Sequence, residues 1–140
     1  AGEAITNTGH NGGSWFTTPS ACLTKFDFAT NTWTGATGAG WAGVRWPDGG
    51  MGFAGLTTAA PPNSVSCAWN SHDAQNGLYP PSSLHPGVVN AVMGDGSVRT
   101  LAETIDCGNP SGSGTGLNGQ SPFGVFGALG SRRGRDRIEN

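Results

Sequence analysis

The sequence has few charged residues. Only 11% of its 140 residues are Asp, Glu, Lys or Arg, whereas charged residues make up about 25% of a typical soluble domain. Lysine occurs once, at Lys25, and the formal net charge is −2. This balance provides no basic surface for nucleic acid or for an anionic membrane, so we expect neither as a partner.

Long apolar runs are also missing. No stretch approaches the roughly 20 apolar residues that a membrane-spanning helix needs, so we expect no membrane-spanning segment within the sequence. Hydrophobic residues make up 35% of the chain, and glycine contributes 25 residues. We therefore expect residues 1–140 to form a single globular domain with a small core and abundant loops.

The spacing of polar residues does not specify a catalytic or metal site. His and Asp supply groups for acid–base chemistry, but no spacing brings them together. Ser71, His72 and Asp73 are consecutive, and three neighbouring side chains cannot converge as a catalytic triad. The loop pattern typical of Ca²⁺ sites is absent, although oxygen-rich turns of other kinds can hold Ca²⁺. We expect no enzyme activity and no cofactor, with Ca²⁺ as the one alternative.

Short strand-like segments separated by Gly, Pro and Asn turns predict a mainly β fold, an antiparallel sheet with long Gly-rich loops. Residues 20–28 favour one or two helical turns, and no longer helix is expected. Residues 108–120 (GNPSGSGTGLNGQ) have the composition of a flexible linker, and we interpret them as a surface loop insertion. The expected strands are residues 13–17, 31–34, 41–46, 52–58, 88–93 and 98–102.

Asp95 and Gly96 separate the last two expected strands. An Asp-Gly dipeptide between such segments predicts a hairpin over residues 88–102 with a tight primed turn, whose central residues need positive φ. A turn centred on these two residues gives the cross-strand pairs Met93 with Val98, Ala91 with Thr100 and Val89 with Ala102, which form an apolar inner face. The opposite face suits partial exposure or a contact with another subunit, and it contains Asn90, Val92, Arg99, Leu101 and Glu103.

His85 precedes Asp95 by nine intervening residues. Nine residues of extended strand span about 30 Å, so a straight strand excludes contact between the two side chains. We therefore expect separate structural roles. His85 fixes the start of the hairpin, and Asp95 with Gly96 makes the turn.

The three cysteines are Cys22, Cys67 and Cys107. Their spacing fits neither a zinc site nor a C-x-x-C redox pair. In a Gly-rich chain with few charges, we interpret them as one disulfide and one odd cysteine. Three reduced, buried thiols are the alternative.

Five tryptophans are many for a chain of this length. Large aromatic side chains can supply core and interface area where Leu and Ile are scarce. They can also form a stacking platform for sugars, since each ring offers a broad apolar face and a polar N–H edge. The candidates for an interface or glycan platform are Trp33, Trp41 and Trp46.

Three segments also carry a family resemblance. His85, nine intervening residues and Asp95-Gly96 form an H-X9-DG pattern. Residues 53–67 (FAGLTTAAPPNSVSC) resemble a segment of the form FTT…PPNS…C. Residues 121–134 (SPFGVFGALGSRRG) resemble a closing segment of the form W.ALGTR.GGE. In this order they resemble a large bacterial family of prepilin-like secreted proteins, often catalogued only as a domain of unknown function. The chain departs from the family pattern at Phe126, where Trp is common, and at Arg135-Asp136, where Gly-Glu is common.

The resemblance implies a structural subunit of an extracellular pilus-like or pseudopilus-like filament at a bacterial cell surface. Such proteins are similar to type IV pilins and type II secretion pseudopilins, and begin with a long apolar helix. The present sequence resembles their C-terminal half. The expected partners are copies of itself and an N-terminal pilin helix or companion chain, which would provide the only membrane contact and make the fold α+β.

The resemblance also favours a disulfide between Cys22 and Cys67, because Cys67 ends the PPNS segment and needs an upstream partner. Cys107 is then expected to be free or paired with a cysteine of the N-terminal half that such proteins have and this sequence lacks. The alternative function is a secreted carbohydrate-binding or surface-binding module that uses exposed tryptophans, and a hydrolase is the third.

Overall fold

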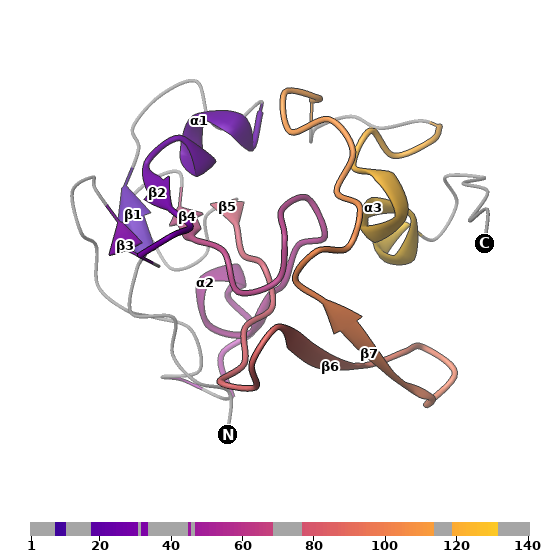
Figure 1. The fold of residues 1–140 in the computed structure, drawn as a ribbon. Coiled ribbons are helices and arrows are strands. Elements are labelled where there is room, and N and C mark those ends of the chain that lie inside the picture. Colours follow the sequence, from indigo (N-terminus) through magenta and orange to yellow (C-terminus); the bar gives the residue numbers. More distant parts are fainter. Residues whose placement is uncertain are drawn as a thin grey trace.

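The computed structural model describes residues 8–10, 18–30, 32–33, 45, 47–68, 77–113 and 119–131. In these ranges the backbone forms short strands and three short helices, so the prediction of a mainly β fold is confirmed (Figure 1). The strands are β1 (Thr8–His10), β2 (Phe26–Asp27), β3 (Thr32–Trp33), β4 (Ser66–Ala68), β5 (Gly77–Leu78), β6 (Val88–Val92) and β7 (Val98–Ala102). The helices are α1 (Ser20–Leu23), α2 (Met51–Ala54) and α3 (Gly124–Gly130).

The strands form three small sheets, in the orders β1-β4-β5, β2-β3 and β6-β7. The part of the chain that the structure describes contains four pairings, and three of them are antiparallel, as expected. The pair of β1 with β4 is parallel, with Thr8 opposite Ser66. Parallel strands need a long crossover connection, and the chain between β1 and β4 supplies it.

Two helices occur where the sequence predicts other structure. The expected strand at 52–58 begins instead with α2, whose first turn is closed by hydrogen bonds from the N–H groups of Phe53 and Ala54 to the Gly50 carbonyl (2.9 and 3.1 Å). The seven-residue α3 is also unexpected, because its sequence GVFGALG contains three glycines and glycine is a poor helix former. Packing of its apolar face, rather than intrinsic propensity, accounts for such a helix.

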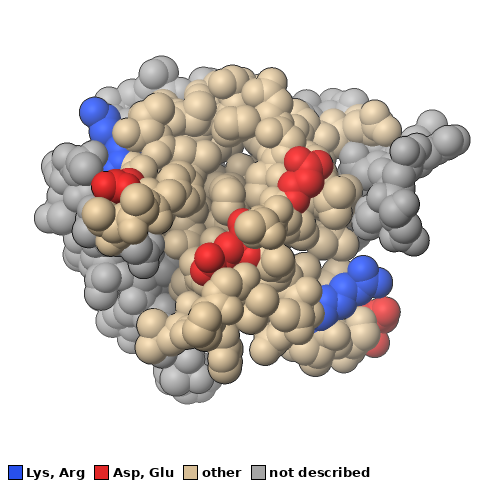
Figure 2. Space-filling view, in the orientation of Figure 1, with Lys and Arg blue, Asp and Glu red and all other residues tan. Residues whose placement is uncertain are grey.

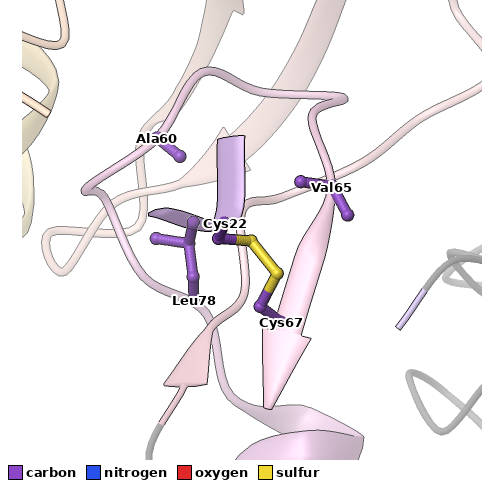
Figure 3. Close-up of a cluster of buried hydrophobic side chains, with 5 residues drawn as sticks. All are labelled: Cys22, Ala60, Val65, Cys67 and Leu78. Carbon is purple, nitrogen blue, oxygen red and sulfur yellow. A yellow bond between two sulfur atoms is a disulfide. The ribbon is translucent and has the colours of Figure 1, made fainter. Parts of the chain in front are cut away.

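A first hydrophobic cluster surrounds a disulfide and joins the early part of the chain to β4 and β5 (Figure 3). Cys22 of α1 is bonded to Cys67 of β4, with the two Cα atoms 6.2 Å apart. The predicted pairing is therefore present, and both cysteines are fully buried. The buried members of the cluster are Cys22, Ala60, Val65, Cys67 and Leu78.

A second hydrophobic cluster lies between the hairpin and α3. Val89 of β6, Leu101 of β7 and Phe126 of α3 are 2%, 8% and 1% exposed. Two small clusters fit a chain with few hydrophobic residues. The second cluster fixes one face of the β6–β7 hairpin, while the hairpin turn points away from the other labelled helices and strands (Figure 1).

Candidate functional site

The β6–β7 hairpin has a register one residue away from the predicted one. Val89 lies opposite Leu101, and Val92 lies opposite Val98. The loop contains three residues rather than two, because the Met93 N–H donates to the Ser97 carbonyl (2.8 Å) and the Gly96 N–H donates to the Met93 carbonyl (2.9 Å). In this arrangement only Gly96 has positive φ, at 81°, as in a turn that ends with a glycine bulge.

The shift exchanges the faces of one strand, because side chains alternate along it. Leu101, predicted on the outer face, is buried against Val89, and Val98, predicted inside, is 66% exposed. Val92 is 75% exposed beside it. The hairpin therefore presents an outward pair of valines, which we call the outer valine pair.

Asp95 organises the turn. Its carboxylate accepts hydrogen bonds from the Ser97 hydroxyl (2.7 Å) and the Ser97 N–H (2.9 Å). These bonds, first the one from the hydroxyl and then the one from the N–H, hold the pKa of Asp95 below its ordinary value of 3.8, and the charge of Arg99 adds to the effect. Asp95 and Gly96 therefore form the turn together with Ser97, which the sequence did not identify as a turn residue.

A pH prediction follows from this geometry. Since the pKa of Asp95 is lower in the folded than in the unfolded chain, its ionised form stabilises the turn above the unfolded pKa. That contribution is lost as the pH falls through the folded pKa. We expect an NMR titration to place the Asp95 pKa below 3.8 and Ser97→Ala to raise it toward that value. Thr100→Ala is the matched control, because its hydroxyl donates to Asn90 (2.9 Å). An Asp95 pKa unchanged by Ser97→Ala would contradict this assignment.

His85 lies before β6 and is exposed. Its N–H donates to the Ser83 hydroxyl (3.1 Å), and its carbonyl accepts a long hydrogen bond from the Val88 N–H (3.5 Å). The backbone of His85 thus forms the turn that leads into β6. Gly87, with φ of 73°, completes the turn, and its carbonyl accepts a hydrogen bond from the Glu103 N–H (2.9 Å).

Asn63 connects this turn to the PPNS segment. Its side-chain oxygen accepts a hydrogen bond from the Ser83 N–H (2.7 Å), and its side-chain amide donates to the Glu103 carboxylate. Its own N–H donates to the Pro81 carbonyl (2.9 Å). Asn63 has φ of 61°, the one positive φ of a non-glycine residue among the described positions, and asparagine tolerates this conformation better than most residues. We call Asn63, Ser83, His85, Gly87 and Glu103 the hairpin junction.

Substitution of Asn63 is expected to loosen the hairpin junction. Asn63→Ala removes two side-chain hydrogen bonds and places alanine in a left-handed conformation, which together should cost about 2 kcal/mol in the free energy of unfolding. Asn63→Gly removes the same bonds but tolerates the backbone, so it should cost roughly half as much. Urea unfolding of the two variants measures the difference. An Asn63→Ala variant at least as stable as Asn63→Gly would rule out a backbone contribution.

The closing segment packs on the same region. The Asp106 carbonyl accepts a hydrogen bond from the Phe126 N–H (2.9 Å), and its carboxylate accepts one from the Gly108 N–H (2.8 Å). A Cβ added at Gly124 would overlap the Asp106 carboxylate, and one added at Gly130 would overlap the Thr58 side chain. The described parts of the three segments quoted for the family resemblance therefore meet around the hairpin, although they lie far apart in the sequence.

Residues 108–113 of the predicted loop insertion are tied to other parts of the chain. The Asn109 N–H donates to the Pro122 carbonyl (2.8 Å), and the Pro110 carbonyl accepts a hydrogen bond from the Ser20 N–H (2.9 Å). Residues 114–118 lie outside the described part of the chain. The beginning of the segment thus connects α1 to the start of the closing segment.

Cys107 is the free cysteine and is half-buried beside the second hydrophobic cluster. Burial, together with the nearby Asp106 charge, raises the pKa of its thiol to about 11. The thiol is therefore protonated at neutral pH, which disfavours nucleophilic chemistry.

The remaining candidate residues do not form a described site. Trp41, Trp46 and the side chain of Trp33 lie outside the described residues, as do residues 71–73 and 13–17. Within the described ranges, no three His, Cys, Asp or Glu side chains are grouped so that they could hold a metal ion. None of the helices in those ranges is long and apolar enough to cross a membrane.

Comparison with known proteins places the chain in a family. A family model described as "Protein of unknown function (DUF1559)" matches residues 3–108 of the 140. The chain belongs to this family. The DUF1559 match includes the segment that ends at Cys67, the hairpin junction and the whole β6–β7 hairpin, and it ends before α3. No curated protein matches the chain, and no solved structure does.

Sequence analysis missed the hydrogen-bonding members of the hairpin junction. Asn63 and Glu103 are separated by 40 residues, and no local pattern connects them. Of these residues, only Asn63 could have been identified from the sequence as a turn residue, because it follows two prolines and asparagine adopts positive φ readily. Its contact with Glu103 could be recognised only in the folded structure.

Proposed function

We propose that this member of the DUF1559 family is a structural subunit of an extracellular pilus-like or pseudopilus-like filament and acts by self-assembly rather than catalysis. The observation that carries the proposal is the projecting β6–β7 hairpin with its outer valine pair, 75% and 66% exposed. Exposed apolar side chains on a projecting element are typical of contact surfaces between proteins. The H-X9-DG resemblance suggests what kind of assembly this surface serves.

The hairpin junction supports the proposal because it fixes the hairpin at its base. Hydrogen bonds from Ser83 and to Glu103 converge on Asn63, and Phe126 packs beneath the strands. A contact arm held in one orientation loses less conformational entropy when it meets a neighbour. His85, Asp95 and Gly96 therefore have structural roles in this proposal.

The sparse charge of the surface is a second support. In the face drawn in Figure 2, most of the described surface belongs to residues other than Lys, Arg, Asp and Glu. Copies with a net charge of −2 repel one another weakly. Head-to-tail contacts between such copies generate a helical filament when they do not close into a ring.

The resemblance to pilins adds two further elements to the proposal. Subunits of this kind are exported to the bacterial cell surface. An N-terminal pilin helix or a companion chain occupies the filament core, and contact with the membrane is made through that helix. The present sequence of 140 residues would form the outer, globular part of each subunit.

Immunogold electron microscopy of material sheared from intact cells tests the proposal. Antibodies against this chain are expected to decorate filaments at regular intervals. Gold confined to dispersed particles would contradict filament assembly. In that event a tryptophan fluorescence shift on addition of glycans would favour the carbohydrate-binding alternative.

A further inference from the structure

Within the described ranges, the outer edge of the β6 strand is unpaired. Two backbone hydrogen bonds show which cross-strand pairs of the hairpin are hydrogen-bonded: the Met93 N–H donates to the Ser97 carbonyl (2.8 Å), and the Glu103 N–H donates to the Gly87 carbonyl (2.9 Å). Residues between them alternate in antiparallel pairs, so the backbone polar groups of Asn90 and Val92 point away from β7. Among the described residues, β6 pairs with β7 alone, and Asn90 and Val92 are exposed.

This edge has no feature that prevents pairing with another strand. Natural edge strands are protected by charged side chains, prolines or bulges. The β6 sequence, VVNAV, contains no charge, proline or glycine, and valine is among the residues with high strand propensity. An exposed edge of this composition is suited to accept a further strand.

The sequence of β6 is also complementary to itself. An antiparallel pairing centred on Asn90 places Asn90 beside Asn90 of a second copy, Val88 beside Val92, and Val89 beside Ala91. Each apolar residue then meets an apolar residue. The backbone groups of Asn90 and the N–H of Val92 fall at hydrogen-bonded positions, the latter opposite the Val88 carbonyl, while the Val88 N–H keeps its long bond to the His85 carbonyl (3.5 Å). The same operation on β7 would place Arg99 beside Leu101. The β6 edge is therefore the better self-pairing surface.

We propose that two copies of this chain associate through their β6 edges to form a four-stranded antiparallel sheet. A two-fold contact of this kind closes on itself, so it joins subunits side by side and does not extend a head-to-tail filament. This contact is additional to the filament contacts of the proposed function. Stable interfaces bury about 1,200 to 2,000 Å². Pairing of one short strand buries less than this, so we expect the association of two isolated copies to be weak. Alignment of many copies along neighbouring filaments would strengthen the contact.

Cysteine cross-linking tests the contact. In a Cys107→Ser background, Asn90→Cys places two thiols at a hydrogen-bonded pair, where the Cα atoms lie about 5.5 Å apart and within the range of a disulfide. Thr100→Cys is the matched control on the opposite edge, where the same pairing separates the two positions by roughly 14 Å. Mild oxidation is expected to give at least about tenfold more dimer for Asn90→Cys. Equal yields from the two variants, or no dimer from Asn90→Cys, would overturn the proposal.

Proline variants identify which edge carries the contact. Val92→Pro removes an outward N–H from β6, and Val98→Pro removes one from β7, and neither substitution breaks a bond within the hairpin. Val92→Pro is expected to reduce the Asn90→Cys dimer to the level of the Thr100→Cys control, while Val98→Pro leaves it unchanged. Equal losses from the two proline variants would overturn edge pairing. Near-ultraviolet circular dichroism checks that both variants keep the fold.

The outcomes separate this proposal from the filament proposal. Filaments that form while Asn90→Cys fails to cross-link would overturn the β6 contact alone. Specific dimers of Asn90→Cys in material that forms no filament would support the β6 contact and contradict the proposed function.

Discussion

Replacement of Cys22 and Cys67 by serine is expected to lower the free energy of unfolding by about 4 kcal/mol. The disulfide joins residues separated by 45 positions, and its loss frees a long loop in the unfolded chain. The two sulfurs are also fully buried in the first hydrophobic cluster. Small domains have total stabilities of roughly 5 to 15 kcal/mol, so the double variant should be largely unfolded at elevated temperature.

Cys107→Ser is the matched control for the disulfide prediction, because Cys107 is free and only half-buried. Its unfolding midpoint in urea should stay close to that of the unmodified chain. Addition of a reductant should reproduce the effect of the double variant in the unmodified chain. If the double variant and Cys107→Ser had the same stability, the disulfide would not hold the first cluster together.

Phe126→Ala is expected to destabilise the protein by about 3 to 5 kcal/mol, as is usual for removal of a buried phenylalanine. Phe126 is 1% exposed and contacts the cluster that includes Val89 and Leu101. The variant leaves a cavity between α3 and the hairpin, and the glycine-rich α3 has little helix propensity of its own. Both α3 and the inner face of the hairpin should therefore become less ordered.

Hydrogen exchange measured by NMR distinguishes this local effect from a general loss of stability. The amides of β6 and β7 should exchange faster in Phe126→Ala, while those of β4 and β5 around the disulfide should change less. Val125→Ala is the neighbouring control, since Val125 is only half-buried. A uniform increase in exchange throughout the chain would show that the two clusters do not act as separate units.

The hairpin shows which features of the fold can be predicted from sequence patterns and which cannot. Asp95 and Gly96 correctly indicated a turn, because an Asp-Gly pair between two β-prone segments has few other solutions. The register was wrong by one residue, since Gly96 can supply the positive φ of a three-residue loop that ends in a glycine bulge as readily as that of a two-residue turn. That single step decided which valines are exposed and thus where the contact surface lies.

The helices and the hairpin junction depend on contacts that no local pattern contains. α2 and α3 are short and glycine-rich, and they are held by Phe53, Phe126 and the residues around them. Asn63 and Glu103 meet only after the chain between them has folded. The disulfide was predicted because the PPNS segment resembles a family pattern. Sequence reasoning thus identified the segments that matter and left their spatial connections to the structure.

Helical reconstruction by cryo-electron microscopy of native filaments that contain this chain tests the central claim most directly. The proposed function predicts a repeating unit into which the two hydrophobic clusters and the projecting β6–β7 hairpin fit, with helical density in the core that residues 1–140 do not occupy. The hairpin should face a neighbouring subunit or a neighbouring filament. Material that contains the chain only as dispersed single copies would contradict a structural role in filaments.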